Sequence, residues 1–167
     1  SMTKMPATVA ALQQVEQGNL DLDAPVADYC PEFAEIQVLT GFDGDTPVLR
    51  PPTRQATVKN LVTHTSGLGY WFWSEDLVKW ESVTGIPNVV AGSAASFKAP
   101  MVGDPGEAFI YGINIDWLGK VVEAVTGTGL DVVIKEGITG PLGMDQTTFL
   151  MNDEQRPNST PVHVKGE

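Results

Sequence analysis

The sequence has 167 residues, 42% of them hydrophobic, and this is sufficient for one domain with a sizeable core. Its 21 acidic and 10 basic residues give a formal net charge of −11, which argues against a nucleic-acid partner and against adhesion to anionic lipid. No apolar run approaches the roughly 20 residues of a membrane span. Two histidines and one cysteine, without HExxH or CxxC, predict no metal site.

The cellular compartment stays open on this sequence. Cys30 has no second cysteine with which to form an intrachain disulfide, so cysteine usage does not indicate a redox environment. No signal peptide is visible, although one could precede residue 1.

The first helix is predicted over residues 5–17, followed by the stop Gly18-Asn19. Its pattern is amphipathic, and one line along the helix carries Met5, Val9, Leu12 and Glu16. Residues 19–56 contain no long periodic segment. We expect turns there, one of them at Asp43-Gly44, and a short helix at 25–29.

Further helices are predicted in the middle of the chain over 58–64 and 75–83, with Ser74 as N-cap of the second. Residues 85–107 hold several glycines and prolines and predict a long connection. Residues 108–111 are expected to be a short extended piece.

The clearest helix follows that connection. Asn114 is expected to cap its start, Gly127 stops it, and its apolar stripe consists of Leu118, Val121, Val122 and Val125. Another helix fits 130–138, and 147–150 is expected to be a strand.

Ser1-Met2-Thr3-Lys4 fits the pattern S-x-x-K, which can activate a serine nucleophile. A serine hydroxyl needs a neighbouring base at neutral pH, and residues three apart at a helix start share one face. Burial and nearby cations favour the neutral form of a lysine, which can accept the Ser1 proton. The same residues also fit an N-cap serine followed by a solvated lysine.

The order of further motifs makes the chain resemble class C β-lactamases and, more closely, family VIII carboxylesterases. The resemblance covers nearly the whole chain. Its motifs are Ser1-Met2-Thr3-Lys4, Gly18 to Val26, Leu61-Val62-Thr63-His64-Thr65-Ser66-Gly67-Leu68, Tyr111-Gly112-Ile113-Asn114, Asp116 to Gly119, and Gly140-Pro141-Leu142-Gly143-Met144.

This resemblance implies the α+β fold of serine β-lactamases and penicillin-binding proteins. Residues 1–167 would be a single, mostly helical section of that domain with few strands. The N-terminal strands and the C-terminal sheet strands of a longer chain would lie outside it.

The resemblance also implies roles for three catalytic residues and no cofactor. Ser1 attacks a carbonyl and becomes acylated, while Lys4 acts as or supports the general base. Tyr111 relays the proton to the leaving group and later helps to activate the water that releases the acyl group. A nearby cation lowers a phenol pKa, so this chemistry is reasonable for a tyrosine beside a lysine.

Two departures from the lactamase pattern stand out: the first favours ester substrates over β-lactams, and the second concerns a strand expected beyond Glu167. Position 113 is Ile where such lactamases usually show the Asn of Tyr-x-Asn, and Asn114 stands one residue too late. No KTG-like motif is present, and Lys165-Gly166 does not match it.

Four consecutive aromatic residues, 70–73, follow a glycine turn, and they cannot all point inward. The resemblance puts this loop beside the catalytic serine. We therefore predict that Trp71, Trp73 and Ile113 line the substrate pocket, with core packing as the alternative for the aromatic run.

The predicted function is hydrolysis of carboxylic esters of short to medium acyl chains through an acyl-serine. β-Lactamase, D-amino-acid peptidase or acyltransferase activity remains open, as does a catalytically silent binding module. An N-terminal nucleophile hydrolase fits poorly, because a helix follows Ser1. His64 is expected to hold its loop through hydrogen bonds, and Ser66 is expected to be a turn residue.

Overall fold

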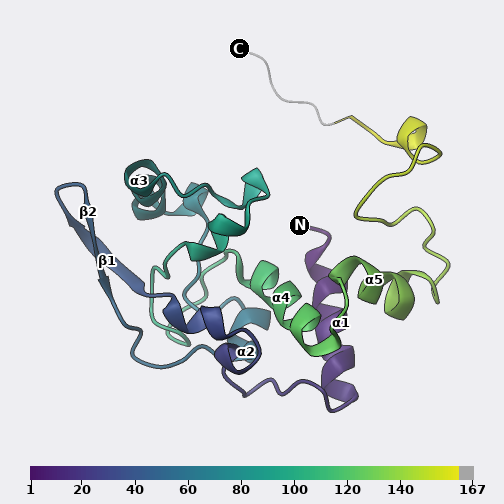
Figure 1. Ribbon diagram of the computed structural model, residues 1–167, viewed down its shortest axis with the longest axis horizontal. Helices are drawn as coiled ribbons and strands as arrows, with labels where there is room; N and C mark the ends of the chain where they lie inside the picture. Colours follow the sequence, from purple (N-terminus) through teal and green to yellow (C-terminus); the bar gives the residue numbers. More distant parts are fainter. Residues whose placement is uncertain (162–167) are drawn as a thin grey trace.

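The computed structural model describes residues 1–161, and Figure 1 shows a helical body from which a two-stranded hairpin projects. The pair Lys165-Gly166 lies outside the described residues. The longer elements are helices α1 (Lys4–Glu16), α2 (Val58–Val62), α3 (Glu75–Thr84), α4 (Asn114–Thr126) and α5 (Leu130–Ile134), and strands β1 (Val38–Asp43) and β2 (Thr46–Arg50). This content confirms the prediction of a mostly helical section with few strands. No helix among residues 1–161 combines the length and apolar character that a membrane crossing requires.

The helix α1 packs on α4 (Figure 1), and the buried face of α1 consists mainly of small side chains. Ala7, Ala10 and Ala11 are buried, and such small residues allow two helix backbones to approach closely. Met5 and Leu12, on the line of larger apolar residues, are 72% and 40% exposed. The sequence pattern therefore predicted the helix correctly, but the alanine face is the one buried within the described chain.

The helix α4 lies at the centre of the core. Leu118, Val121 and Val122 are fully buried, as the apolar stripe predicted, and Gly127 ends the helix in the left-handed conformation with φ of 65°. The prediction for Asn114 is wrong, because Ile113 is the N-cap residue and Asn114 is the first residue of the helix. Its buried amide instead bonds to neighbouring loops.

The hairpin of β1 and β2 is antiparallel and was not predicted. Pairing runs from Val38 opposite Arg50 to Asp43 opposite Thr46, with an irregularity between Leu39 and Gly41. Polar residues interrupt both strands, so no alternating apolar pattern marks them. The turn expected at Asp43-Gly44 is the tip of this hairpin.

The remaining helix predictions hold, with small changes. Ser74 caps α3 by accepting a hydrogen bond from the Leu77 N–H at 3.4 Å. The helix predicted over 130–138 is α5 continued by a π-helical turn, Lys135–Thr139. Shorter 3₁₀ turns occupy Val26–Asp28, Pro31–Glu35, Trp71–Trp73, Val89–Ala91, Ala94–Lys98 and Arg156–Asn158.

Two extended segments were predicted wrongly. Residues 108–111 and 147–150 form no strand. The Thr148 hydroxyl donates to the Leu150 carbonyl at 2.9 Å, so the second segment folds on itself.

Candidate active site

Ser1 and Lys4 lie at the start of α1, which has 13 residues. The Lys4 N–H donates to the Ser1 carbonyl at 3.2 Å, so one turn of chain separates the two residues. The first N–H groups of a helix point away from its body and favour negative charge nearby. The Lys4, Met5 and Ala7 N–H groups already donate to the carbonyls of Ser1, Met2 and Thr3, so this end of α1 favours negative charge near Ser1 through the helix dipole rather than through free donors.

Tyr111, which lies far from Ser1 in the sequence, is located at the same end of α1. Its hydroxyl lies 2.9 Å from Ser1 Oγ, a hydrogen bond in which either oxygen can be the donor. Lys4 Nζ lies 5.1 Å from the centroid of the Tyr111 ring. The structure thus brings together Ser1, Lys4 and Tyr111, the three residues predicted to be catalytic.

Two interlocked loops, 64–70 and 101–113, place Tyr111. The Ile110 N–H donates to the His64 carbonyl at 2.7 Å, and the Val102 N–H donates to the Gly67 carbonyl at 2.8 Å. Gly112 lies so close to the first loop that a Cβ there would be 2.2 Å from the Leu68 carbonyl oxygen. Position 112 therefore needs glycine for space.

Asn114 ties both loops to α4. Its side-chain amide donates to the carbonyls of Leu68 and Ile110 at 3.1 and 3.2 Å. Its carbonyl oxygen accepts from the Ser66 hydroxyl at 2.6 Å, and both residues are fully buried. Ser66 is therefore a structural residue of the turn, as expected.

An ion pair between Arg50 and Asp104 holds the loop 101–113 near its start. Arg50 donates to both carboxylate oxygens of Asp104, at 2.5 and 3.0 Å, and the Thr53 N–H donates to the same group at 2.8 Å. The Arg50 guanidinium and the Thr53 N–H hold the pKa of Asp104 well below its usual range. This pair fixes the start of the segment that leads to Tyr111.

The charges around Lys4 differ from the simple expectation of a buried, neutral lysine. Burial lowers the pKa of Lys4, but contacts with the phenols of Tyr70 and Tyr111 outweigh it, and the pKa lies above its ordinary value. The hydrogen bond with Ser1 and the nearby Lys4 ammonium lower the pKa of Tyr111. The arrangement favours a charged lysine beside an acidified phenol, so Tyr111 is better suited than Lys4 to accept the Ser1 proton.

Contrary to the prediction, the side chain of His64 does not hold its loop through hydrogen bonds to the described residues. Its Nδ1 is buried and has no hydrogen-bond partner within residues 1–161, so the main chain rather than this atom holds the loop. The ring packs against Tyr111 with centroids 4.8 Å apart, and its φ is 54°. Burial and the Lys4 charge lower the pKa of His64, which favours neutral imidazole behind the tyrosine.

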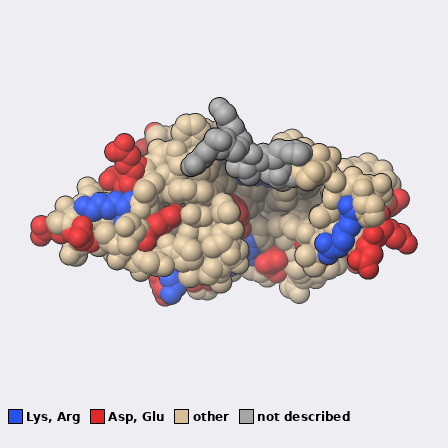
Figure 2. All heavy atoms as spheres, turned by 90° about the horizontal axis from the view of Figure 1, so that it is seen from above, with Lys and Arg blue, Asp and Glu red and all other residues tan. Residues whose placement is uncertain are grey.

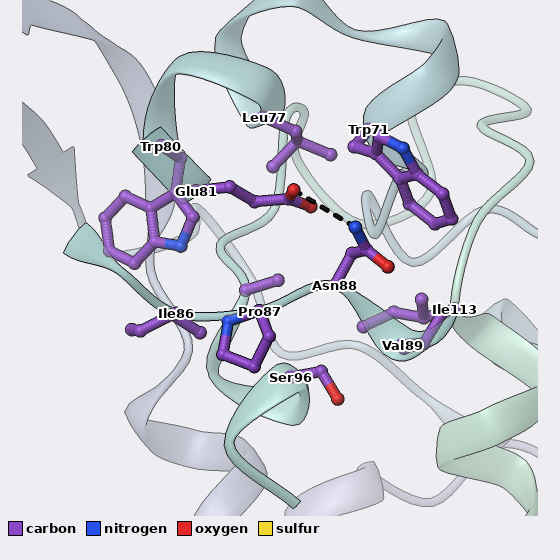
Figure 3. A pocket seen from close by; sticks show the side chains of 12 residues that line it. Trp71, Leu77, Trp80, Glu81, Ile86, Pro87, Asn88, Val89, Ser96 and Ile113 are labelled. Atoms are coloured by element: carbon purple, nitrogen blue, oxygen red, sulfur yellow. Dashed lines mark hydrogen bonds between the residues drawn. The ribbon is translucent and has the colours of Figure 1, made fainter. Parts of the chain in front are cut away.

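The three predicted pocket residues line two separate hollows. Trp71 and Ile113 border a hollow of about 20 Å³, beside the Asn88–Glu81 hydrogen bond of 3.2 Å (Figure 3). Its volume suits about one water molecule, so it has no room for an acyl chain. Ile113 itself is 3% exposed and belongs to the core.

Trp73 borders a larger hollow of about 250 Å³, and Tyr111 lies in its wall. Phe109, which sequence reasoning missed, lines the same hollow and is 69% exposed. We call this space the Trp73 hollow; its wall consists of Gly69, Tyr70, Trp73, Ser74, Val102, Phe109, Ile110 and Tyr111.

The surface of the molecule carries many acidic side chains, in keeping with the 21 acidic residues of the sequence. Figure 2 shows acidic side chains standing out toward both ends of the molecule. Within residues 1–161, no three His, Cys, Asp or Glu side chains cluster as a metal site would require.

Comparison with known proteins identifies relatives over nearly the whole chain. A family model described as Beta-lactamase matches residues 1–166. A lovastatin esterase from Penicillium rubens is 40% identical over 152 residues, 89% of this chain and 38% of that protein. A monacolin J acid methylbutanoyltransferase from Aspergillus terreus is 38% identical over 160 residues, 95% of this chain and 38% of that protein.

Solved structures share the fold. Simvastatin synthase (LovD) from Aspergillus terreus, unliganded, superposes with a TM-score of 0.82 at 39% identity, covering 95% of this chain and 39% of that one. EstCE1, described as a hydrolase with promiscuous acyltransferase activity, gives a TM-score of 0.65 at 28% identity over 86% of this chain and 36% of that one. The chain thus spans about 38% of the length of the curated relatives that it matches.

Proposed function

Because the chain belongs to the beta-lactamase family, we propose that its protein is a serine esterase that forms a covalent acyl intermediate on Ser1. The observation that carries the proposal is the hydrogen bond of 2.9 Å between Ser1 Oγ and the Tyr111 hydroxyl. Lys4 lies beside the same phenol, so a nucleophile, a proton acceptor and a cation meet at one helix end.

The proposed reaction begins with proton transfer from the Ser1 hydroxyl to the Tyr111 phenolate. Ser1 Oγ then bonds to the ester carbonyl carbon, and negative charge develops on the carbonyl oxygen near the start of α1. When the carbon–oxygen bond to the alcohol breaks, Tyr111 gives its proton to the departing alkoxide. The same phenolate takes a proton from water, which attacks the acyl-Ser1 ester. The bond between the acyl carbon and Ser1 Oγ then breaks, the carboxylic acid leaves, and Tyr111 returns the proton to Ser1 Oγ. Lys4 stays charged throughout and stabilises the phenolate.

Transfer of the acyl group to an alcohol is the second candidate. An acyl-serine reacts with any hydroxyl that reaches it, so the same acyl-Ser1 intermediate can serve hydrolysis or transfer. Relatives named as an esterase and as acyltransferases match this chain at similar identity. A D-amino-acid peptidase or β-lactamase activity lacks a comparable observation, since the amide expected at position 113 is replaced by a buried Ile.

The test is covalent labelling of the intact protein with a fluorophosphonate probe, together with hydrolysis of p-nitrophenyl butyrate. Ser1→Ala should lose labelling and at least about 10³-fold of the turnover, because no covalent intermediate can form. Ser82→Ala, at an exposed serine of α3, should behave as wild type. Retention of most activity by Ser1→Ala would remove Ser1 from the mechanism, and an unlabelled, inactive wild type would favour the catalytically silent binding module.

Competition between water and alcohol separates the two candidates. The intact protein is given p-nitrophenyl butyrate with increasing concentrations of an alcohol, and butyric acid and the butyrate ester of that alcohol are quantified. An esterase keeps butyric acid as its main product. A transferase shifts most of the acyl group to the alcohol at concentrations far below that of water.

A further inference from the structure

A second tyrosine lies against the charged end of Lys4. Lys4 Nζ is 5.4 Å from the centroid of the Tyr70 ring and 5.1 Å from that of Tyr111. The two rings meet close to edge-on, with centroids 5.3 Å apart and planes at 67°. The ammonium therefore has an aromatic ring on two sides, an arrangement that attracts cations.

The two tyrosines differ in what else they touch. Tyr70 is 8% exposed, and burial raises its pKa. Tyr111 touches Ser1, and its pKa is lowered. Tyr70 consequently keeps its proton under conditions in which Tyr111 can lose its own.

Lys4 depends on these rings for its position. None of the ion pairs formed by residues 1–161 involves Lys4, and a lysine side chain is long and flexible. His64 and Asp116 also interact electrostatically with Lys4, but neither forms an ion pair with it. Without Tyr70, one of the two rings that confine the ammonium is gone.

We infer that Tyr70 is a positioning residue, which holds the Lys4 ammonium beside Tyr111 and so prepares the Tyr111 hydroxyl to take the Ser1 proton. This inference rests on the proposed function, since it gives Tyr70 a part in proton transfer at Ser1. Removal of the Tyr70 hydroxyl takes away a contact that raises the pKa of Lys4. A less firmly held cation lowers the pKa of Tyr111 less, so that pKa should rise.

Neighbouring residues supply a matched control. Phe72 stacks on Tyr70 with centroids 4.9 Å apart and planes at 17°, and it is 53% exposed. Phe72→Leu disturbs the packing of Tyr70 without removing its hydroxyl. Tyr70→Phe removes the hydroxyl and keeps the ring, and Tyr70→Leu removes both.

The kinetic test uses the intact protein and p-nitrophenyl butyrate over a range of pH. For Tyr70→Phe we expect a loss of about 10-fold in kcat with little change in KM, smaller than the 10²–10⁴-fold typical of losing a general base. The acid limb of kcat/KM should move to higher pH in Tyr70→Phe, further in Tyr70→Leu, and not in Phe72→Leu. His64 and Asp116 are unchanged in all three variants, so their titration contributes equally to every pH profile and cannot cause a difference between variants.

A readout that needs no turnover keeps this inference separate from the proposed function. Isotope-labelled tyrosine is followed by NMR, and the Tyr111 signal is the one lost in Tyr111→Phe. Its titration should move to higher pH in Tyr70→Phe relative to wild type and Phe72→Leu. An unchanged Tyr111 titration would reduce Tyr70 to a packing residue, whatever the activity. If Ser1→Ala remained active, the proposed function would fail while the NMR comparison still decided whether Tyr70 acts on Tyr111.

Discussion

Ser1 Oγ and the Tyr111 hydroxyl are 2.9 Å apart although 110 positions separate the two residues in the sequence. The contact depends on the loops 64–70 and 101–113, whose backbones bond directly to each other. Lys4, the first residue of α1, lies beside the phenol rather than between the two hydroxyls. This order favours a path in which the proton moves from Ser1 to Tyr111 and the lysine acts through its charge.

Tyr111→Phe and Lys4→Met should each lower kcat by about 10²–10⁴-fold, because both residues serve one proton path. For the same reason, the double variant should lose little more than the worse single variant. Tyr29→Phe, at a tyrosine whose hydroxyl accepts from the Asp21 N–H at 3.0 Å, is the control and should retain activity. Steady-state kinetics with p-nitrophenyl butyrate measures all four. Fully additive losses would show that Lys4 and Tyr111 act independently.

The Trp73 hollow should bind the acyl chain of the ester. Burial of each methylene contributes about 0.8 kcal/mol when it is complete, about fourfold in kcat/KM. Activity should therefore rise from acetate to butyrate, then fall once the hollow is full. Trp73→Ala and Phe109→Ala should flatten this rise, whereas Trp71→Ala, at the small hollow, should keep it.

The same substrate series tests the choice of ester over β-lactam. Nitrocefin should be cleaved far more slowly than the best p-nitrophenyl ester, because the buried Ile113 offers no amide to the lactam side chain. A kcat/KM for nitrocefin that matches or exceeds the best ester would replace the esterase assignment with the β-lactamase alternative.

Gly112→Ala should destabilise the protein by about 1–3 kcal/mol or more, the usual cost of overpacking. The added Cβ would meet backbone atoms of Leu68 and Gly69 at 2.2 and 2.5 Å, and Tyr111 is the adjacent residue. Activity should fall with stability. Gly137→Ala is the control, because its Cβ would meet only the end of the Gln13 side chain. Equal urea midpoints for the two variants would contradict the close approach of the loops.

Asp104→Asn should remove part of the dependence of stability on acid pH. The folded-state pKa of Asp104 is depressed by Arg50 and the Thr53 N–H. Its stabilising effect is therefore complete above the unfolded value of about 3.9 and is lost as pH falls toward the folded pKa. Urea midpoints of wild type and Asp104→Asn should differ most above about pH 5 and converge in stronger acid.

The matched control for this pH dependence is Asp45→Asn. Asp45 pairs with Lys79 at 3.9 Å, but its side chain is 92% exposed, so its replacement should have little effect at any pH. A constant difference between wild type and Asp104→Asn across the acid range would rule out the ion pair as its source.

The sequence by itself determined the features that follow from neighbouring residues. The S-x-x-K spacing, the apolar stripe of α4 and its glycine stop are local patterns, and the structure shows each where it was predicted. The order of the motifs along the chain also indicated the family, because that order is read directly from the sequence. The role of Asn114 was misread, since a cap and a buried link between loops look alike in sequence.

Only the tertiary structure decided which residues meet across long stretches of chain. Tyr70 joins Lys4 and Tyr111 because the loop after α2 turns back over the start of α1, and no spacing in the sequence records that turn. Tertiary packing also decided which residues line the Trp73 hollow. Trp73 and Phe109 lie in its wall, whereas Trp71 and Ile113 border the smaller hollow. Side chains of one kind look equivalent in sequence, and packing between distant segments determines which of them face the proposed catalytic residues.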